Sequence, residues 1–430
     1  MTDPNQQLHD LLNDMVSAYS EKQNGFHATA AATPPATPPA HSPTKPPKPT
    51  PAQIGVHLHP ILDRMCFDAE DRGASDIFIS AGFAPAMKIN SKLTPVSMPM
   101  LTAADTQEIA DSTMNDDQKA EFKAKLELNY SVQSRSDTRY RVNAYHEQGR
   151  VGLVLRRINS EVPTVEDLSL PLVLNQLIMK SRGMLILAGA TGSGKSTSMA
   201  AMLNYRNHNL PGHIITIEDP IEYLHRPKKC IITQREIGID TESWELAVQN
   251  AMRQAPDVVC IGEVRSQESM EYALQLAQTG HLCVFTIHAT SANQAIERIM
   301  NLYPEERHKQ VLMDIAMNLT GIIGQRLVVK RDNSGRTAIV DLLINTPAIQ
   351  DLIFKGDLMG IKELMQRSVD EGMQTFDQNL FNLYLRGIIS YDEALRQADS
   401  ANDLRLRIQL HEDGGKPDHL FDRVSDLNLI

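Results

Sequence analysis

A glycine-rich loop between an apolar run and a helical segment constrains this chain more than any other feature. The loop, residues 189–196, reads Gly-Ala-Thr-Gly-Ser-Gly-Lys-Ser and directly follows the apolar residues 184–188. The pattern G-x-x-x-x-G-K-[ST] turns backbone N–H groups toward phosphate oxygens, while its lysine adds positive charge and its serine a hydroxyl ligand for Mg²⁺. The sequence therefore predicts a P-loop that binds ATP and Mg²⁺ through Gly189, Ala190, Thr191, Gly192, Ser193, Gly194, Lys195, Ser196 and Thr197.

Three further apolar runs have the composition of strands that are buried on both faces. They occupy residues 214–217, 258–261 and 283–287, and alternate with helical segments. This alternation predicts an α/β fold with a mostly parallel sheet covered by helices. Ligands of such sheets bind beyond the carboxyl ends of the strands. We therefore expect the polar residues that follow the runs to converge on the P-loop.

Carboxylates follow two of these runs, and an NTPase needs such groups to orient water and to hold the metal. Glu218 and Glu263 are the candidate catalytic residues with Lys195, and the candidate Mg²⁺ ligands with Ser196, partly through water. Gly262 stands where many NTPases carry a metal-binding aspartate. We therefore expect Glu263 or Glu218 to do more of the metal binding and water orientation than in those NTPases. A helix N-cap with solvated neighbours is the alternative for the acidic cluster around Glu218.

His288 follows the last run and is a candidate sensor of the γ-phosphate, although a satisfied core or surface histidine is the alternative. Arginines cluster before residue 158, and arginine is favoured where the charge of a transferring phosphoryl group must be neutralised. Arg139, Arg141 and Arg156 are the candidates, with surface salt bridges as the alternative.

The length of 430 residues exceeds the roughly 250–300 at which one hydrophobic core stops growing, so we expect two folded domains with tails. The sequence predicts a proline-rich N-terminal extension with a short amphipathic helix (residues 1–55), followed by a small α+β domain (56–158). A hinge (159–165) then leads to an ATPase domain (166–410) and a flexible tail (411–430). The helix predicted within residues 8–19 is either frayed or docked on its own domain, or is a partner-docking peptide.

Composition excludes several classes of protein. The net charge of −11 disfavours nucleic acid as the partner. The four cysteines form no C-x-x-C pair, which predicts reduced core thiols. No apolar run approaches the roughly 18 residues that span a bilayer, and the start lacks the features of a secretory signal, so we expect a cytoplasmic protein.

The order of the motifs resembles the type II/IV secretion-type ATPases. After the P-loop, which is the family's Walker A motif, residues 217–223 match its Asp box, 253–265 its atypical Walker B motif and 279–288 its His box. The resemblance extends from about residue 56 to 410. It implies a homohexameric ring whose subunits have a PAS-like N-terminal domain and a RecA-like P-loop ATPase domain, with nucleotide between the domains and arginines of the first domain reaching phosphate.

Within this family the chain is similar to the pilus retraction branch, since it lacks the tetracysteine zinc module of many assembly and secretion ATPases. Gln350 and Phe354 replace basic residues of the main retraction ATPases, which favours an accessory role in pilus retraction and twitching motility. The implied partners are a PilT-like ATPase and an inner-membrane pilus platform protein. The alternatives are an ATP-binding ring scaffold for a partner motor, and a pilus assembly or secretion ATPase.

Overall fold

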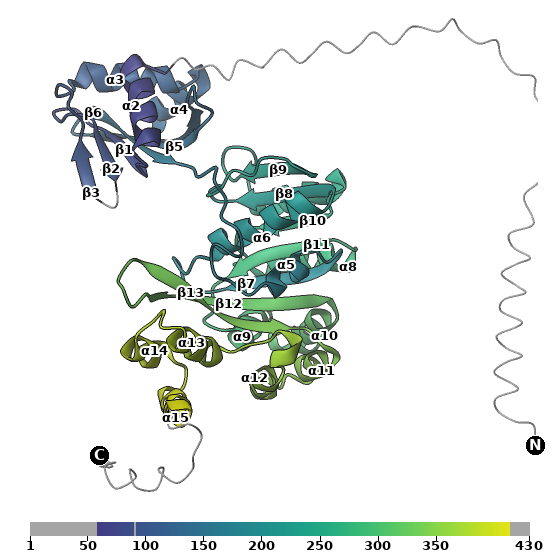
Figure 1. Cartoon of the computed structure of the whole chain (residues 1–430). Helices are drawn as coiled ribbons and strands as arrows, with labels where there is room; N and C mark the ends of the chain where they lie inside the picture. Colours follow the sequence, from purple (N-terminus) through teal and green to yellow (C-terminus); the bar gives the residue numbers. More distant parts are fainter. Residues whose placement is uncertain (1–57, 90–91, 413–430) are drawn as a thin grey trace, which may run out of the picture. The chain divides into compact units, whose positions relative to one another are not determined.

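The computed structural model describes residues 58–89 and 92–412, which are organised around two β-sheets (Figure 1). The amphipathic helix and proline-rich extension predicted within residues 1–55 lie outside the described residues, as does the predicted tail from residue 413. Among the residues that are described, no helix is both long and apolar enough to cross a membrane.

The first sheet is antiparallel, with the strand order β3-β2-β1-β6-β5-β4. Its strands β1 to β6 are Asp76–Ile79, Ala86–Ile89, Lys92–Pro95, Glu127–Gln133, Arg139–Glu147 and Arg150–Arg157, and its helices α2 to α4 are Pro60–Asp71, Ala103–Thr113 and Asp116–Lys125. The sequence predicts a turn at Gln148 and Gly149, and these residues connect β5 to β6 with φ values of 51° and 76°. Tyr140 and Leu153 are fully buried in the core between this sheet and its helices.

The second sheet has the order β13-β12-β7-β11-β10-β8-β9, and only β13 runs antiparallel to its neighbour. Strands β7 to β13 are Gly183–Ala188, Gly212–Glu218, Cys230–Glu236, Val258–Ile261, Leu282–Ile287, Leu319–Val329 and Arg336–Ile344. Every residue of β7, β10 and β11 is buried, which explains their uninterrupted apolar sequences. The four strands that the sequence predicts, β7, β11, β10 and β8, lie side by side in this order and are parallel.

Helices cover both faces of this sheet. They are α5 to α10, at Val173–Ile178, Lys195–Asn209, Trp244–Ala251, Gln267–Gln278, Ala292–Met300 and His308–Asn318, with short 3₁₀ helices at Met252–Gln254 and Glu305–Arg307. Successive residues of a strand point to opposite faces, so Ile186 packs in a core with α8 and α9 while Leu187 packs in another with α5 and α6. All four cysteines are buried and none forms a disulfide.

The sequence beyond about residue 305 predicts a largely helical segment, and the chain beyond residue 344 is helical. It forms α11 to α15, at Pro347–Lys355, Leu358–Arg367, Phe376–Leu385, Tyr391–Gln397 and Ala401–Glu412, with a 3₁₀ helix at Val369–Glu371. Helices α13, α14 and α15 bury a separate apolar cluster against Val328 and Ile339. Helix α15 ends at Glu412 and so includes residues 411 and 412, which the sequence assigns to the flexible tail.

Within this part of the chain the sequence predicts a hairpin around residues 327–340, and the hairpin in the structure is longer. Pairing between β12 and β13 runs from Gly321–Ile344 to Val329–Arg336, and β12 also pairs in parallel with β7. The first half of β12 directly follows α10 and lies in the part that the sequence predicts as helix. Pairing with β7, far away in the sequence, makes this segment a strand and attaches the hairpin to the main sheet (Figure 1).

Asp341 is a charged residue in the interior of β13, where only 5% of its surface is exposed. Its Oδ2 accepts a hydrogen bond of 2.8 Å from the backbone N–H of Ala292. Burial raises the pKa of Asp341 to about 7; Asp399 also raises it, while the Ala292 hydrogen bond, Lys362 and Arg326 oppose the shift. The carboxyl group thus binds its proton more tightly in the folded chain than in an unfolded one.

This shift predicts a pH-dependent stability. Between the unfolded value of about 4 and the folded value of about 7, the folded state holds a proton that the unfolded state has lost, so stability falls as pH rises. Asp341→Asn keeps the acceptor for Ala292 but removes this titration. Relative to the wild type, the thermal midpoint of the variant should therefore rise as pH increases from about 5 to about 8. A difference in midpoint that stays constant over that range contradicts the prediction.

Candidate active site

The P-loop connects β7 to α6 through a tight turn. Gly192 and Gly194 adopt φ values of 77° and 88°, a region that side chains other than glycine rarely occupy. A Cβ atom on Gly189 would lie 2.3 Å from the Ser193 Oγ, so this position requires glycine for close packing. The first N–H groups of α6 have no carbonyl acceptor within the helix and carry its positive dipole end. The loop has the geometry that phosphate binding requires.

Lys195 lies inside this loop. Its Nζ donates hydrogen bonds of 2.8 Å and 3.0 Å to the carbonyls of Gly189 and Ala190. Burial lowers the pKa of Lys195, and the charges of Glu263 and Glu222 oppose the shift. The predicted lysine and one predicted glutamate are therefore close enough to interact electrostatically.

Gln325 of β12 attaches the P-loop and helix α6 to the sheet through two hydrogen bonds, a role that the sequence does not indicate. Its Nε2 donates to the Ser193 carbonyl at 2.9 Å, and its Oε1 accepts from the Ser198 hydroxyl at 2.8 Å. Only 2% of its surface is exposed. The only signal in the sequence is a polar side chain inside the largely apolar segment 319–329, which the sequence does not identify as one strand.

Glu263 and His288 meet at the ends of β10 and β11. Glu263 Oε2 accepts from Arg265 Nη2 at 2.7 Å. Its Oε1 lies 2.9 Å from His288 Nε2 but outside hydrogen-bond geometry, so this buried oxygen has no donor. Burial acts to raise the pKa of Glu263, but Arg265, His288 and Lys195 outweigh it and the pKa is lowered. The side chain is a carboxylate held between Arg265 and His288, with one buried oxygen that accepts no hydrogen bond.

Glu218 ends β8, the strand beside β10. Its Oε1 accepts from Thr216 Oγ1 at 2.7 Å and from Gln234 Nε2 at 3.2 Å. Burial raises the pKa of Glu218, and these two hydrogen bonds offset part of the shift. In contrast to Glu263, its nearest partners are neutral, so the two glutamates have different electrostatic environments.

Gln234 of β9 also organises the acidic loop after Glu218. Its Nε2 donates to the Tyr223 carbonyl at 2.9 Å, and its Oε1 accepts from the His225 N–H at 2.8 Å. The Tyr223 hydroxyl donates to Thr197 Oγ1 at 3.2 Å, which ties the loop to the first turn of α6. The sequence does not indicate these contacts of Gln234 and Tyr223, because residues 230–236 lack a clear alternation of apolar and polar residues.

Two of the three predicted arginines lie beside carboxylates. Arg141 Nε lies 3.8 Å from Glu236 Oε1, and Arg156 Nε lies 2.8 Å from Asp76 Oδ1. Burial raises the pKa of Glu236, and Arg139 and Arg141 oppose the shift. The role of Arg139, Arg141 and Arg156 in contacting phosphate stays a prediction.

The Mg²⁺ ligands also stay a prediction. Among residues 58–89 and 92–412, no three histidine, cysteine or acidic side chains are grouped closely enough to hold a metal by themselves. Magnesium retains several waters and is commonly bound through one or two protein oxygens together with substrate phosphates. The donor set of Ser196 and the free Oε1 of Glu263 fits this mode of binding.

Comparisons with known proteins agree with this geometry. The chain matches the family model for "Type II/IV secretion system protein" over residues 56–396. It is 50% identical over 359 residues to the type IV pilus ATPase PilU of Pseudomonas aeruginosa, which covers 84% of this chain and 94% of that protein. It is 37% identical over 338 residues to the type IV pilus retractation ATPase PilT of the same organism, which covers 79% of this chain and 98% of that protein.

Among solved structures, the pilus retraction motor PilT with bound ADP matches with a TM-score of 0.75 and 37% identity, covering 80% of this chain and 98% of that chain. The predicted fold class, a RecA-like P-loop ATPase domain preceded by a smaller PAS-like α+β domain, is confirmed. The sequence resemblance to secretion-type ATPases is confirmed as well.

The hydrogen bonds of Gln234 give a prediction for ATP hydrolysis. Gln234→Met keeps the shape of the side chain but removes the donor to Glu218 and both contacts to the acidic loop. We expect kcat to fall about tenfold, since one lost hydrogen bond to a charged group corresponds to roughly 1.4 kcal/mol or more. Ile231→Ala, on an exposed position of the same strand, is the matched control. Equal kcat in both folded variants contradicts a role for Gln234.

Proposed function

The chain belongs to the type II/IV secretion system protein family and is an ATPase of that family, and from this premise we propose that it powers or assists type IV pilus retraction. The observation that carries the proposal is the 50% identity to PilU over 84% of the chain. The convergence of Lys195, Glu263 and His288 at one sheet edge supplies a site that suits ATP hydrolysis. The C-terminal segments 373–378 and 398–406 also look like those of PilU, which supports the same branch.

The protein's own residues suggest the following division of work. The P-loop N–H groups and the helix dipole of α6 bind phosphate, and Lys195 shifts from the loop carbonyls to the β- and γ-phosphates. Bound Mg²⁺ supplies charge neutralisation on the phosphate oxygens, with Ser196, Glu218 and Glu263 as its protein ligands, partly through water. The carboxylates of Glu263 and Glu218 orient the attacking water, and His288 contacts the γ-phosphate.

We further propose that hydrolysis changes the angle between the two domains, and that a homohexameric ring transmits this change to the pilus base. The partners in this proposal are a PilT-like ATPase and a platform protein, at the cytoplasmic face of the inner membrane. Gln350 and Phe354 on α11 support an accessory role, because the main retraction ATPases usually carry arginine there. Phe354 is 48% exposed and is therefore available to contact a partner.

The lysine provides the direct test of hydrolysis. Lys195→Ala removes the positive charge from the P-loop and should abolish steady-state ATP turnover, and Glu263→Gln should lower kcat by about 100-fold or more. Lys123→Ala, an exposed lysine on α4, is the matched control and should retain the wild-type rate. Robust turnover by the Lys195 variant refutes the assignment of this site.

A retraction assay separates a motor from a ring scaffold that only binds ATP. In cells that also contain an intact PilT-like ATPase, Lys195→Ala should reduce the retraction force to the level of a strain lacking this protein. Full retraction force with the Lys195 variant favours the scaffold and contradicts a contribution from hydrolysis at this site.

A further inference from the structure

The loop that follows β11 connects His288 to helix α9. His288 lies 2.9 Å from Glu263, and α9 begins four residues later at Ala292, with Ser291 as its N-cap. The position of this loop therefore constrains where His288 lies relative to Glu263. Two strands hold this loop in place through hydrogen bonds. Arg326 of β12 donates to the Thr290 carbonyl, and Asp341 of β13 accepts from the Ala292 N–H.

Arg326 contacts four groups at once. Its Nη2 donates to the Thr290 carbonyl at 3.1 Å and to Asp399 Oδ1 at 3.0 Å, and its Nη1 donates to the Gln397 carbonyl at 3.3 Å. Its guanidinium carbon lies 4.0 Å from the centroid of the Phe376 ring. A planar guanidinium suits several acceptors and a ring face together, which a lysine ammonium cannot reproduce.

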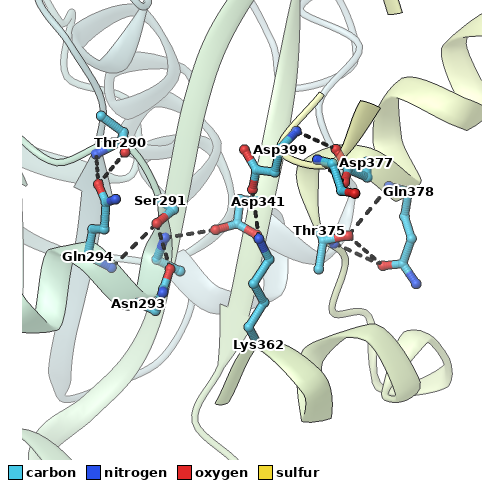
Figure 2. Close-up of polar contacts among 12 residues, drawn as sticks. Thr290, Ser291, Asn293, Gln294, Asp341, Lys362, Thr375, Asp377, Gln378 and Asp399 are labelled. Atoms are coloured by element: carbon cyan, nitrogen blue, oxygen red, sulfur yellow. Dashed lines mark hydrogen bonds and ion pairs between the residues drawn. The ribbon is translucent and has the colours of Figure 1, made fainter. Parts of the chain in front are cut away.

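Two acceptors of Arg326, Gln397 and Asp399, lie at the end of α14 and just after it. Asp399 lies between α14 and α15, and its other oxygen accepts from Lys362 of α12 at 3.0 Å (Figure 2). The Asp377 carboxylate accepts from the N–H groups of Asp399 and Ser400 at 2.8 Å and 3.1 Å. In the view of Figure 2, Asp341 lies between Lys362 and Ser291. The loop after His288 is thereby connected to α12, α13 and the start of α15.

Adjacent residues of β12 hold two different parts of the site. Gln325 holds the P-loop through Ser193 and Ser198, and Arg326 holds the Thr290 carbonyl two residues after His288. Successive side chains of a strand point to opposite faces, which is why two neighbours reach two loops. Gly324, the residue before Gln325, pairs with Ala188 at the end of β7, so both side chains extend from backbone that is attached to the main sheet.

We propose that Arg326 is a positioning residue for ATP hydrolysis, which holds His288 against Glu263 through Thr290 and couples that position to the C-terminal helices. This inference rests on the proposed ATPase function and adds a residue that belongs neither to the P-loop nor to the Glu263–His288 pair. Displacements of about 1 Å in a catalytic group can lower a rate by 10- to 100-fold, so the loss of the Thr290 contact should be visible in kcat.

Lys362 provides a matched control. It pairs with the same carboxylate, Asp399, but touches neither Thr290 nor Gln397. Its side chain is 38% exposed, and ion pairs at this exposure contribute little to stability. Lys362→Gln therefore tests the loss of a charge from this group without the loss of the loop contact.

The test compares Arg326→Gln, Arg326→Lys and Lys362→Gln in the full-length protein, with kcat, KM for ATP and the thermal midpoint as readouts. Both Arg326 variants should lower kcat about tenfold while KM changes less than about twofold. Lys362→Gln should retain both constants. Arg326→Lys keeps the charge beside Asp399, so it stays informative if the glutamine variant unfolds. Wild-type kcat in a folded Arg326 variant overturns the proposal.

A second arm asks whether Arg326 acts through His288. In a His288→Asn background, with residual turnover measured at high enzyme concentration, Arg326→Gln should lower kcat by less than about twofold. The same tenfold loss with and without His288 shows that Arg326 acts elsewhere and overturns the proposal. Failure of the proposed ATPase function is recognised separately, because wild type and Lys195→Ala then hydrolyse ATP equally slowly.

Discussion

The parallel register of β7, β11, β10 and β8 is the constraint on which the candidate site depends. Ile261 aligns with Ile217 and with Phe285, so the residues that follow these strands emerge at one edge of the sheet. Burial of all residues in β7, β10 and β11 makes this register costly to change, because a slip would expose apolar side chains. The apolar cores on both faces thereby fix the separation of catalytic groups that are distant in the sequence.

The two candidate catalytic glutamates have different electrostatic environments, although the sequence gives them the same candidate roles. Glu263 lies among cations, and its pKa is lowered, whereas burial beside neutral donors raises the pKa of Glu218. Lys195 lies among carbonyls of its own loop, where burial lowers its pKa. An anionic phosphate is well suited to such a site, because it gives the lysine a counter-charge and occupies the N-terminus of α6.

Local motifs allowed much of this arrangement to be predicted. The P-loop, the four buried strands and the polar residue after each of them depend on short-range patterns, and all of them form as expected. Gln325 and Gln234 were missed because their roles depend on strand pairing. Gln325 reaches Ser193 across 132 residues, and nothing near it in the sequence specifies that contact. The same reason explains why β12 was predicted too short, since its first half resembles the helix before it until β7 is placed beside it.

The account makes one central claim, that the edge formed by the P-loop, Glu263 and His288 binds and hydrolyses ATP. A crystal structure of the full-length protein with Mg²⁺ and a non-hydrolysable ATP analogue tests it most directly. The account predicts the β- and γ-phosphates against Lys195 and the first turn of α6, with His288 and Glu263 facing the γ-phosphate. A nucleotide bound away from this edge, or a γ-phosphate that neither His288 nor Glu263 faces, would contradict the claim.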